Sequence, residues 1–215
     1  MATKDLNALR QHYSRHELDE SQVHPSPLEQ LKIWVEEAIA SQLPEPNAMT
    51  MATVTESGQP TTRVVLLKEI RPQGLVFYTN YESRKGLELS HNPLMALNFL
   101  WLELERQVRI EGVAVKLSHE ESLAYFQARP RESQIGAWAS HQSQSIPSRV
   151  ILEKRFHELQ EKYADEPALP LPPFWGGYVV EPSLVEFWQG RASRLHDRVQ
   201  YRRTVEQWFI ERLQP

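Results

Sequence analysis

Near the end of the chain the sequence reads Trp188-Gln189-Gly190-Arg191-Ala192-Ser193-Arg194-Leu195-His196-Asp197-Arg198. Residues 183–188 and 199–203 on either side have the composition of short strands, so the stretch predicts a loop between two strands of a sheet. Arginine binds phosphate or carboxylate through paired hydrogen bonds, and histidine can exchange a proton near neutral pH. The loop is therefore a candidate anion site, although a solvated basic loop balanced by Asp197 has the same composition.

Short segments of strand composition also recur upstream of this loop. They are rich in Thr, Val, Leu and aromatic residues, and Ser57-Gly58, Pro72-Gln73-Gly74 and a turn near Glu103 separate them. They span residues 48–55, 61–69, 75–79, 94–102 and 107–117. Together with the C-terminal strands they predict a barrel, in a mainly β fold with peripheral helices.

Serine residues precede the segments that have helical periodicity. Ser26 and Ser118 are each followed three residues later by Glu, which predicts a capping box at both helix starts. Ser83 and Ser148 are expected to cap two further helices, and residues 132–140 are expected to form a short one.

Composition excludes several classes of protein. The 215 residues carry a net charge of −4, which argues against a general nucleic-acid binder, and the absence of cysteine excludes disulfides and thiolate chemistry. The chain has no apolar run of the roughly 18–20 residues that a membrane span needs, and its first residues lack the apolar core of a signal peptide. His12 and His16 have no third ligand at a metal-site spacing. We expect a cytoplasmic protein without a metal site.

The start of the helix after Ser83 is a candidate phosphate site. Free backbone N–H groups at a helix start attract anions, whereas the cations Arg84 and Lys85 are unfavourable there. An anionic partner would relieve that repulsion. The alternative is that both cations are solvated surface charges.

A second group of donors suits a phosphomonoester. Tyr125 and Arg129 lie one helical turn apart, and Ser133 and Lys68 add a hydroxyl and an ammonium. Arg63 and Lys68 are five residues apart, so on a regular strand they are expected to point to opposite faces. From residue types alone, exposed surface charges remain the alternative.

Six segments, in order along the chain, resemble the pyridoxamine 5'-phosphate oxidase family. The resemblance runs from about residue 9 to the C-terminus and includes the loop quoted first. The segments are Arg10-Gln11-His12-Tyr13, Arg63-Val64-Val65-Leu66-Leu67-Lys68, Tyr78-Thr79-Asn80 with Ser83-Arg84-Lys85, Leu104-Glu105-Arg106-Gln107-Val108, Tyr125 to Trp138, and Trp188 to Arg198.

The resemblance implies an FMN-binding split β-barrel that works as a homodimer with FMN at the subunit interface. Residues 1–25 are expected to be a flexible segment that closes over the site, and residues 26–215 a single domain. The implied reaction is oxidation of pyridoxamine 5'-phosphate or pyridoxine 5'-phosphate to pyridoxal 5'-phosphate, with O2 as acceptor and H2O2 as product.

The resemblance also assigns roles to residues, which we carry over as expectations. Arg194 and His196 are expected to be catalytic and to face the substrate. Further substrate-binding residues would be Arg10, Tyr13, Lys68, Tyr125, Arg129 and Ser133. The FMN-binding residues would be Arg63, Val64, Val65, Leu66, Leu67, Lys68, Tyr78, Thr79, Arg84, Lys85, Gln107, Gln142, Ser143, Trp188 and Arg198.

Two other classes of function are weighed against this one. A flavin reductase with the same fold would share the FMN segments but should lack the Tyr125, Arg129 and Ser133 set and the Arg194 and His196 pair. A protein that stores or delivers pyridoxal phosphate would need no FMN segments. A nucleic-acid role is disfavoured, because the aromatic residues do not alternate with a basic stripe.

Overall fold

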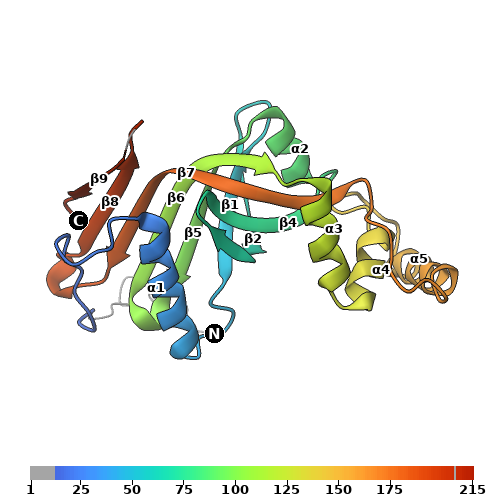
Figure 1. Cartoon of the computed structure of the whole chain (residues 1–215), viewed down its shortest axis with the longest axis horizontal. Coiled ribbons are helices and arrows are strands. Elements are labelled where there is room, and N and C mark those ends of the chain that lie inside the picture. The colour runs from blue at the N-terminus through green and yellow to red at the C-terminus, as the bar shows by residue number, and fades with distance from the viewer. Residues whose placement is uncertain (1–12, 206) are drawn as a thin grey trace, which may run out of the picture. The chain divides into compact units, whose positions relative to one another are not determined.

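The computed structural model describes residues 13–205 and 207–215 (Figure 1). They form two compact units. The terminal unit comprises residues 13–49, 97–111 and 183–215 without residue 206, and the central unit comprises residues 50–96 and 112–182. Four strands contribute residues to both units: β1 (Ala48–Val54), β5 (Leu94–Trp101), β6 (Arg106–Lys116) and β7 (Trp175–Gln189).

The central unit is built on a sheet. Its strands hydrogen-bond in the order β2-β1-β5-β6-β7-β4-β3, where β2 is Pro60–Leu66, β3 is Glu69–Arg71 and β4 is Gly74–Asn80. Strand β4 pairs antiparallel with β7, from Leu75↔Val180 to Asn80↔Trp175. Gly74 is required where these strands begin to pair, because a Cβ there would lie 1.8 Å from the carbonyl oxygen of Val180.

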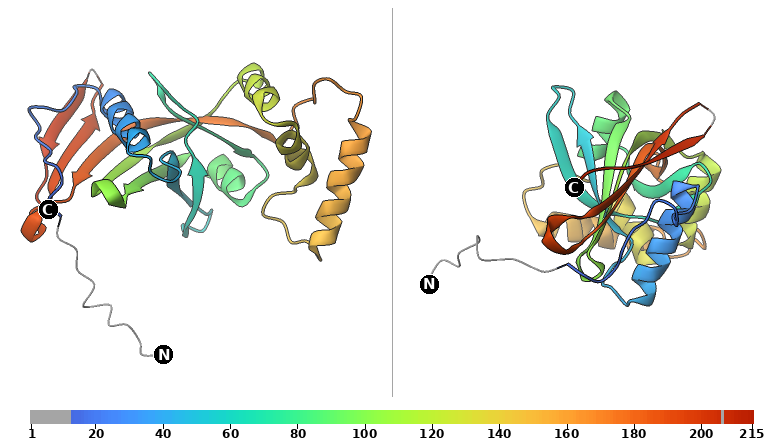
Figure 2. Two further views of the ribbon diagram at one scale, coloured as in Figure 1. Left: turned by 90° about the horizontal axis from the view of Figure 1, so that it is seen from below. Right: turned by 90° about the vertical axis from the view of Figure 1, so that its left-hand side faces the viewer.

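Four helices belong to the central unit, and three of them share a small core. In Figures 1 and 2, α3, α4 and α5 lie beside one another. Phe126, Ile135, Tyr163, Leu169 and Trp175 form a buried cluster that joins these helices to the start of β7. The helices are α2 (Arg84–His91), α3 (His119–Ala128), α4 (Arg131–Ala139) and α5 (Arg149–Lys162).

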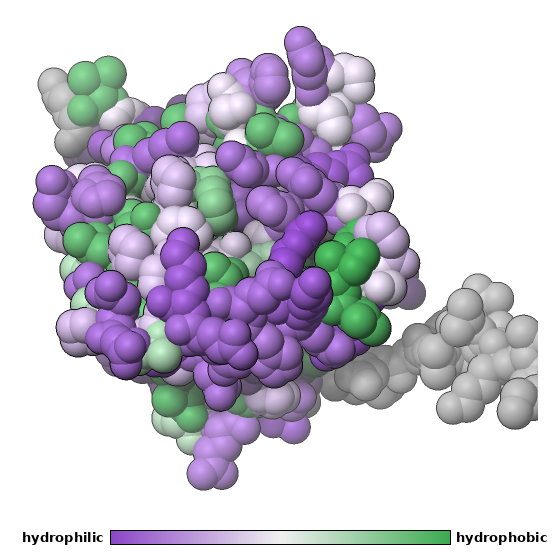
Figure 3. Space-filling model, turned by 90° about the vertical axis from the view of Figure 1, so that its right-hand side faces the viewer, coloured by the Kyte–Doolittle hydropathy of each residue, from purple (hydrophilic) through white to green (hydrophobic). Residues whose placement is uncertain are grey.

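Helix α5 packs against that core through one face only. None of its residues is buried, although Phe156 and Leu159 pack against the buried cluster. The face drawn in Figure 3 is accordingly mostly hydrophilic, with hydrophobic side chains in small separate groups. The apolar side chains of α5 therefore lie at the edge of the core rather than within it.

The terminal unit contains the hairpin predicted at the end of the chain. Strand β7 pairs with β8 (Asp197–Arg203) from Leu184↔Arg202 to Gln189↔Asp197, and β8 pairs with β9 (Trp208–Arg212). Helix α1 (Pro27–Ala40) packs on this sheet through Trp34, whose ring lies 5.0 Å from that of Phe187. The short helices η2 (Leu102–Leu104) and η3 (Ala192–Arg194) connect β5 to β6 and β7 to β8.

The strand boundaries differ from expectation in two places. The segment predicted as one strand over residues 61–69 is two strands, because β2 ends at Leu66 and the backbone N–H of Lys68 bonds the carbonyl of Val76 on β4 instead. The strand expected at residues 183–188 is the second half of β7, which runs through Pro182. The sequence analysis did not predict β9 as a separate strand.

The helix caps follow the prediction at some helices only. The capping box at Ser118 is complete, with Glu121 bonding back to the Ser118 N–H, and the Ser83 hydroxyl accepts a bond from the N–H of Gly86. The capping box expected at Ser26 is wrong, since its side chain makes no capping bond, and neither does that of Ser148. Glu29 instead pairs with Lys32, one helical turn along α1.

The mainly β fold class with peripheral helices is confirmed. The pairs β3–β4, β4–β7, β7–β8 and β8–β9 are all antiparallel. Among the described residues, no helix has both the length and the apolar character that crossing a membrane requires.

Candidate functional site

A cavity of about 820 Å³ opens in the central unit. It is bounded by β2, the bend after β2, β4, the start of α2, the junction of α3 with α4 and the loop that follows α4. Its lining carries five cationic side chains, and none of the described residues in that lining is acidic. The cavity is therefore built for an anionic ligand. Its cations are Arg63, Lys68, Arg84, Lys85 and Arg129.

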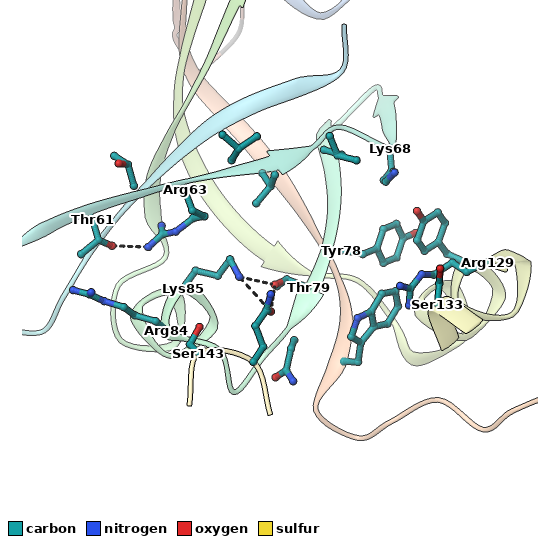
Figure 4. A pocket seen from close by; sticks show the side chains of 18 of the residues that line it. Thr61, Arg63, Lys68, Tyr78, Thr79, Arg84, Lys85, Arg129, Ser133 and Ser143 are labelled. Atoms are coloured by element: carbon teal, nitrogen blue, oxygen red, sulfur yellow. Dashed lines mark hydrogen bonds between the residues drawn. The ribbon is translucent and has the colours of Figure 1, made fainter. Parts of the chain in front are cut away.

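The first cationic group lies around the start of α2 (Figure 4). Arg63 and Arg84 both bind the buried carboxylate of Glu88, at 3.1 Å and 3.0 Å. Burial alone raises the pKa of Glu88, but hydrogen bonds from Thr53, Thr61 and the two arginines outweigh it and lower the pKa to about 2. Glu88 thus stays ionised and fixes two guanidinium groups at one end of the cavity.

Lys85 completes this group from the first turn of α2. Its ammonium bonds neutral oxygen atoms of Thr79 at 3.2 Å, Ser83 at 3.3 Å and Gln142 at 3.3 Å. Burial lowers its pKa to about 8, and the nearby charge of Arg63 adds to the effect. A buried cation at the positive end of a helix is poorly stabilised by its surroundings. A bound phosphate would supply the missing negative charge.

The second cationic group lies around Arg129. The rings of Tyr78 and Tyr125 stack with their centroids 3.7 Å apart, and Trp175 lies nearly parallel to both. The Arg129 guanidinium lies 4.7 Å from the centre of the Trp175 ring. Lys68 and Ser133 project into the same end of the cavity (Figure 4).

Arg129 carries a buried donor without a partner. Its Nη1 atom is inaccessible to solvent and has no hydrogen-bond partner among the described residues. Burial lowers the pKa of Arg129, yet a guanidinium keeps its charge at neutral pH. Because buried charged donors are normally hydrogen-bonded, an anion at this end of the cavity would stabilise the Arg129 guanidinium.

Most of the site residues predicted from the sequence line this cavity. They come from four separate segments of the central unit. Leu67 is buried in the bend after β2 and does not line the cavity. The expectation that Arg63 and Lys68 point to opposite faces is wrong, because β2 ends between them and both line the cavity. The lining residues that were predicted are Arg63, Val64, Val65, Leu66, Lys68, Tyr78, Thr79, Arg84, Lys85, Tyr125, Arg129, Ser133, Gln142 and Ser143.

Six other predicted residues lie in the terminal unit: Tyr13, Gln107, Trp188, Arg194, His196 and Arg198. Trp188 and His196 pack with ring centroids 4.6 Å apart, and Tyr13 contacts both rings edge-on at 5.9 Å and 5.7 Å. His196 Nδ1 accepts a bond from the backbone N–H of Arg191, so the neutral ring carries its proton on Nε2. Arg194 is exposed and has a positive φ of 63°.

The remaining expectations concern Arg198, Gln107 and Arg10. Arg198 forms two hydrogen bonds with the buried carboxylate of Glu186, at 2.8 Å and 3.0 Å. Gln107 is half-buried on β6. Arg10 lies outside the described residues. The roles carried over for these three residues stay predictions.

Among the residues that sequence reasoning missed, Glu88 and Trp175 contribute most to the cavity. Glu88 lies four residues after Arg84, a spacing that places both on one face of α2 and could have predicted their pairing. Trp175 lines the cavity beneath Arg129, but nothing in its local sequence distinguishes it from a core tryptophan. Thr61 and Asn80 were also missed in the lining.

Comparison with known proteins gives one consistent family. A family model described as "Pyridoxamine 5'-phosphate oxidase" matches residues 35–163, and one described as "Pyridoxine 5'-phosphate oxidase C-terminal dimerisation region" matches residues 175–215. Proteins named pyridoxine/pyridoxamine 5'-phosphate oxidase are similar over nearly the whole chain. That of Acaryochloris marina is 54% identical, covering 98% of this chain and 95% of its own, and that of Burkholderia thailandensis is 55% identical, covering 98% and 99%.

Solved structures agree on the fold. PhzG from Burkholderia lata, solved with tetrahydrophenazine-1-carboxylic acid, is 34% identical with a TM-score of 0.86, covering 91% of this chain and 96% of its own. A pyridoxamine 5'-phosphate oxidase-related, FMN-binding protein from Nostoc punctiforme is 17% identical with a TM-score of 0.70, covering 88% and 98%. The second likeness shows the split-barrel fold alone.

Proposed function

The chain belongs to the pyridoxamine 5'-phosphate oxidase family, and from that premise we propose that it oxidises pyridoxamine 5'-phosphate or pyridoxine 5'-phosphate to pyridoxal 5'-phosphate. The proposed cofactor is FMN, and O2 is the acceptor and is reduced to H2O2. With pyridoxamine 5'-phosphate the reaction also consumes water and releases the amine nitrogen as ammonia. The observation that carries the proposal is a cavity with a cationic group at each of two ends, which suits two phosphate groups on two different molecules.

The group around α2 fits the FMN phosphate. Arg63, Arg84 and Lys85 provide three cations against the single carboxylate of Glu88, and the α2 start adds backbone N–H groups. The adjoining β2 residues from Val64 to Leu66 offer an apolar edge for the flavin ring. The chemistry that FMN supplies when bound is two-electron oxidation of the substrate and reduction of O2 to hydrogen peroxide.

The group around Arg129 fits the substrate phosphate. Lys68, Tyr125, Arg129 and Ser133 supply an ammonium, a phenol, a guanidinium and a hydroxyl, and the unpartnered Nη1 of Arg129 lacks an acceptor. An anchored phosphate would hold the reacting carbon in place, which is catalysis by positioning. In this account Arg194 and His196 contact the reacting end of the substrate, and Tyr13 closes over it.

We also propose the setting in which the enzyme works. The match of residues 175–215 to a dimerisation region supports a homodimer, with FMN bound at the interface between its subunits. A cytoplasmic location is part of the same proposal, and the absence of cysteine from the sequence is consistent with it.

The substrate assignment is tested in two ways, by removing the phosphate from the substrate and by removing the Arg129 side chain from the protein. FMN-loaded protein should consume O2 with pyridoxamine 5'-phosphate far faster than with unphosphorylated pyridoxamine. Arg129→Ala should raise KM for the phosphorylated substrate roughly 10–100-fold, the effect of losing a charged hydrogen bond.

Arg149→Ala is the matched control, because that arginine is exposed on α5 and pairs only locally with Glu153. It should leave KM unchanged. Equal rates with and without the substrate phosphate, or an unchanged KM in Arg129→Ala, would contradict the assignment and favour a flavoprotein with a different substrate, such as a flavin reductase.

A further inference from the structure

The first described residues of the chain are held by carboxylates through their backbone. We call residues 13–18 the N-terminal strap. Glu105 Oε2 accepts bonds from the N–H groups of Ser14 at 2.9 Å and Arg15 at 3.1 Å, and Asp197 Oδ2 accepts one from the N–H of Leu18 at 3.1 Å. Because these bonds go to the main chain, they hold the strap whatever its side chains are.

Glu105 is itself fixed firmly to the end of β7. It follows η2 in a left-handed conformation with φ 54°, and its carbonyl oxygen accepts bonds from the N–H of Gly190 at 2.7 Å and from Gln189 Nε2 at 3.2 Å. A carboxylate that accepts two N–H groups makes stronger bonds than a neutral acceptor does. Glu105 therefore joins the strap to the strand end that carries Trp188.

These bonds also hold Tyr13 in place, because Tyr13 directly precedes Ser14 and Arg15, whose N–H groups bond Glu105. Its ring stands edge-on to those of Trp188 and His196. The space for it depends on Gly190, because a Cβ there would lie 2.8 Å from Tyr13 Cγ and 3.0 Å from Glu105 Cβ. The anchor, the glycine and the tyrosine thus form one packed arrangement within the terminal unit.

A separate set of ion pairs holds the far end of the strap. Arg212 bonds the carbonyl of Leu18 at 2.9 Å and the carboxylates of Asp197 and Glu20, while Arg191 pairs with Glu17 at 2.7 Å. These contacts fix residues 17–20. Glu105 is the charged group bonded nearest to Tyr13.

We propose that Glu105 is a positioning residue, which holds Tyr13 against Trp188 and His196 by binding the backbone of the strap. The inference rests on the proposed function, in which Tyr13 closes over the substrate. Glu105 does not contact the substrate in this account. Its effect on the reaction passes through Tyr13 alone.

Trypsin tests the anchor without any substrate, because it cleaves after Arg15, whose own N–H is bound by Glu105. In the FMN-loaded full chain, Glu105→Ala should speed cleavage between Arg15 and His16 at least about tenfold, measured as the mass of the product that begins at His16. Glu105→Gln keeps an acceptor oxygen and should give an intermediate rate. Glu103→Ala, at an exposed carboxylate two residues earlier, is the control and should match the unaltered protein.

A double-mutant cycle tests whether Glu105 acts through Tyr13. Glu105→Ala should raise KM for pyridoxamine 5'-phosphate roughly tenfold, with a smaller change in kcat and with FMN retained. In a Tyr13→Ala background the same substitution should have no further effect on KM. Equal effects of Glu105→Ala in both backgrounds would overturn the proposal.

The two assays separate this inference from the proposed function. If the unaltered protein does not oxidise pyridoxamine 5'-phosphate, the proposed function fails, and the trypsin assay still decides whether Glu105 anchors the strap. If oxidation proceeds but Glu105→Ala changes neither the cleavage rate nor KM, the function stands and the role of Glu105 is rejected.

Discussion

At the scale of single residues, the protonation of Lys85 should be coupled to the binding of a phosphate in the cavity. Burial and the neighbouring Arg63 lower its pKa to about 8. Below pH 8 the apoprotein therefore holds a charged ammonium at Lys85, and above pH 8 this amine is increasingly neutral. A phosphate binds the charged form, so binding must restore the proton when the pH is high.

This sets a pH dependence for cofactor binding. FMN affinity should be nearly constant from pH 7 to 8 and should then weaken by up to about tenfold per pH unit, because each bound FMN must take up a proton at Lys85. The dissociation constant of FMN at each pH is measured by the quenching of FMN fluorescence on titration with apoprotein. Lys85→Gln should bind FMN more weakly and without this dependence. An affinity that is flat to pH 9.5 in the unaltered protein would show that Lys85 does not meet the phosphate.

A backbone hydrogen bond fixes the orientation of the His196 ring. Its Nδ1 accepts a bond from the backbone N–H of Arg191, so the neutral ring presents Nε2–H as a hydrogen-bond donor. His196→Ala should lower kcat roughly 10–100-fold while FMN stays bound, because a polar contact at the reacting end is lost.

Steady-state kinetics on protein of measured flavin content checks this role. His157→Ala is the control, since His157 is exposed on α5. Loss of FMN from His196→Ala, with normal kcat once the flavin is restored, would assign His196 to cofactor binding instead.

At the scale of elements, the sequence predicted most strands and helices because their signals are local. A composition rich in Thr, Val, Leu and aromatic residues, with turn residues between the segments, predicts the bounds of β1, β4, β5 and β6 to within one or two residues. The failures come from tertiary contacts. The N–H of Lys68 bonds Val76 on another strand, and no pattern within residues 61–69 encodes that partner.

Helix caps show the same limit. Ser26 and Ser118 have the same capping sequence, yet only Ser118 closes the box. At Ser26 the backbone N–H donates to the His24 ring at 3.0 Å, and Glu29 pairs with Lys32 instead. The competing partners are specific to each place, so the motif predicts a helix start more securely than it predicts the bonds there.

Two glycines within helices should respond oppositely to alanine. A Cβ at Gly86 in α2 would lie 2.2 Å from the carbonyl oxygen of Tyr81, whereas a Cβ at Gly136 in α4 meets nothing within 4 Å. Gly86→Ala should lower the free energy of unfolding by about 1–3 kcal/mol, and Gly136→Ala should raise it by about 0.5–1 kcal/mol. Urea unfolding followed by circular dichroism measures both. Similar effects at the two positions would contradict the local packing described for α2.

At the scale of the whole molecule, most site residues were predicted from the family resemblance, and only a few were predicted from their physical chemistry. Charge and helix-start arguments pointed to Arg84 and Lys85, and donor chemistry pointed to Arg129 with its neighbours. That these groups line one cavity could not be read from spacing, because β2, α2 and the α3–α4 junction are brought together only by the fold of the central unit.

The proposed dimer makes a prediction about mass and stability. In the isolated chain Leu100, Leu102 and Phe209 of the terminal unit are 54%, 66% and 47% exposed, and the proposed dimer would have apolar side chains of this kind to cover. Sedimentation should give twice the chain mass of 25.1 kDa. The Tm should rise with protein concentration, because association stabilises the folded state. A monomer with a concentration-independent Tm would contradict the dimer.

The central claim is that the cavity holds FMN and a phosphorylated B6 substrate that reduces it. The most direct test is the absorbance spectrum of the purified, FMN-loaded protein before and after anaerobic addition of pyridoxamine 5'-phosphate. The account predicts a flavin spectrum that bleaches on addition and returns when air is admitted. A flavin spectrum that stays unchanged would contradict the proposed substrate, and a protein that cannot be loaded with FMN would contradict the assignment of the cavity itself.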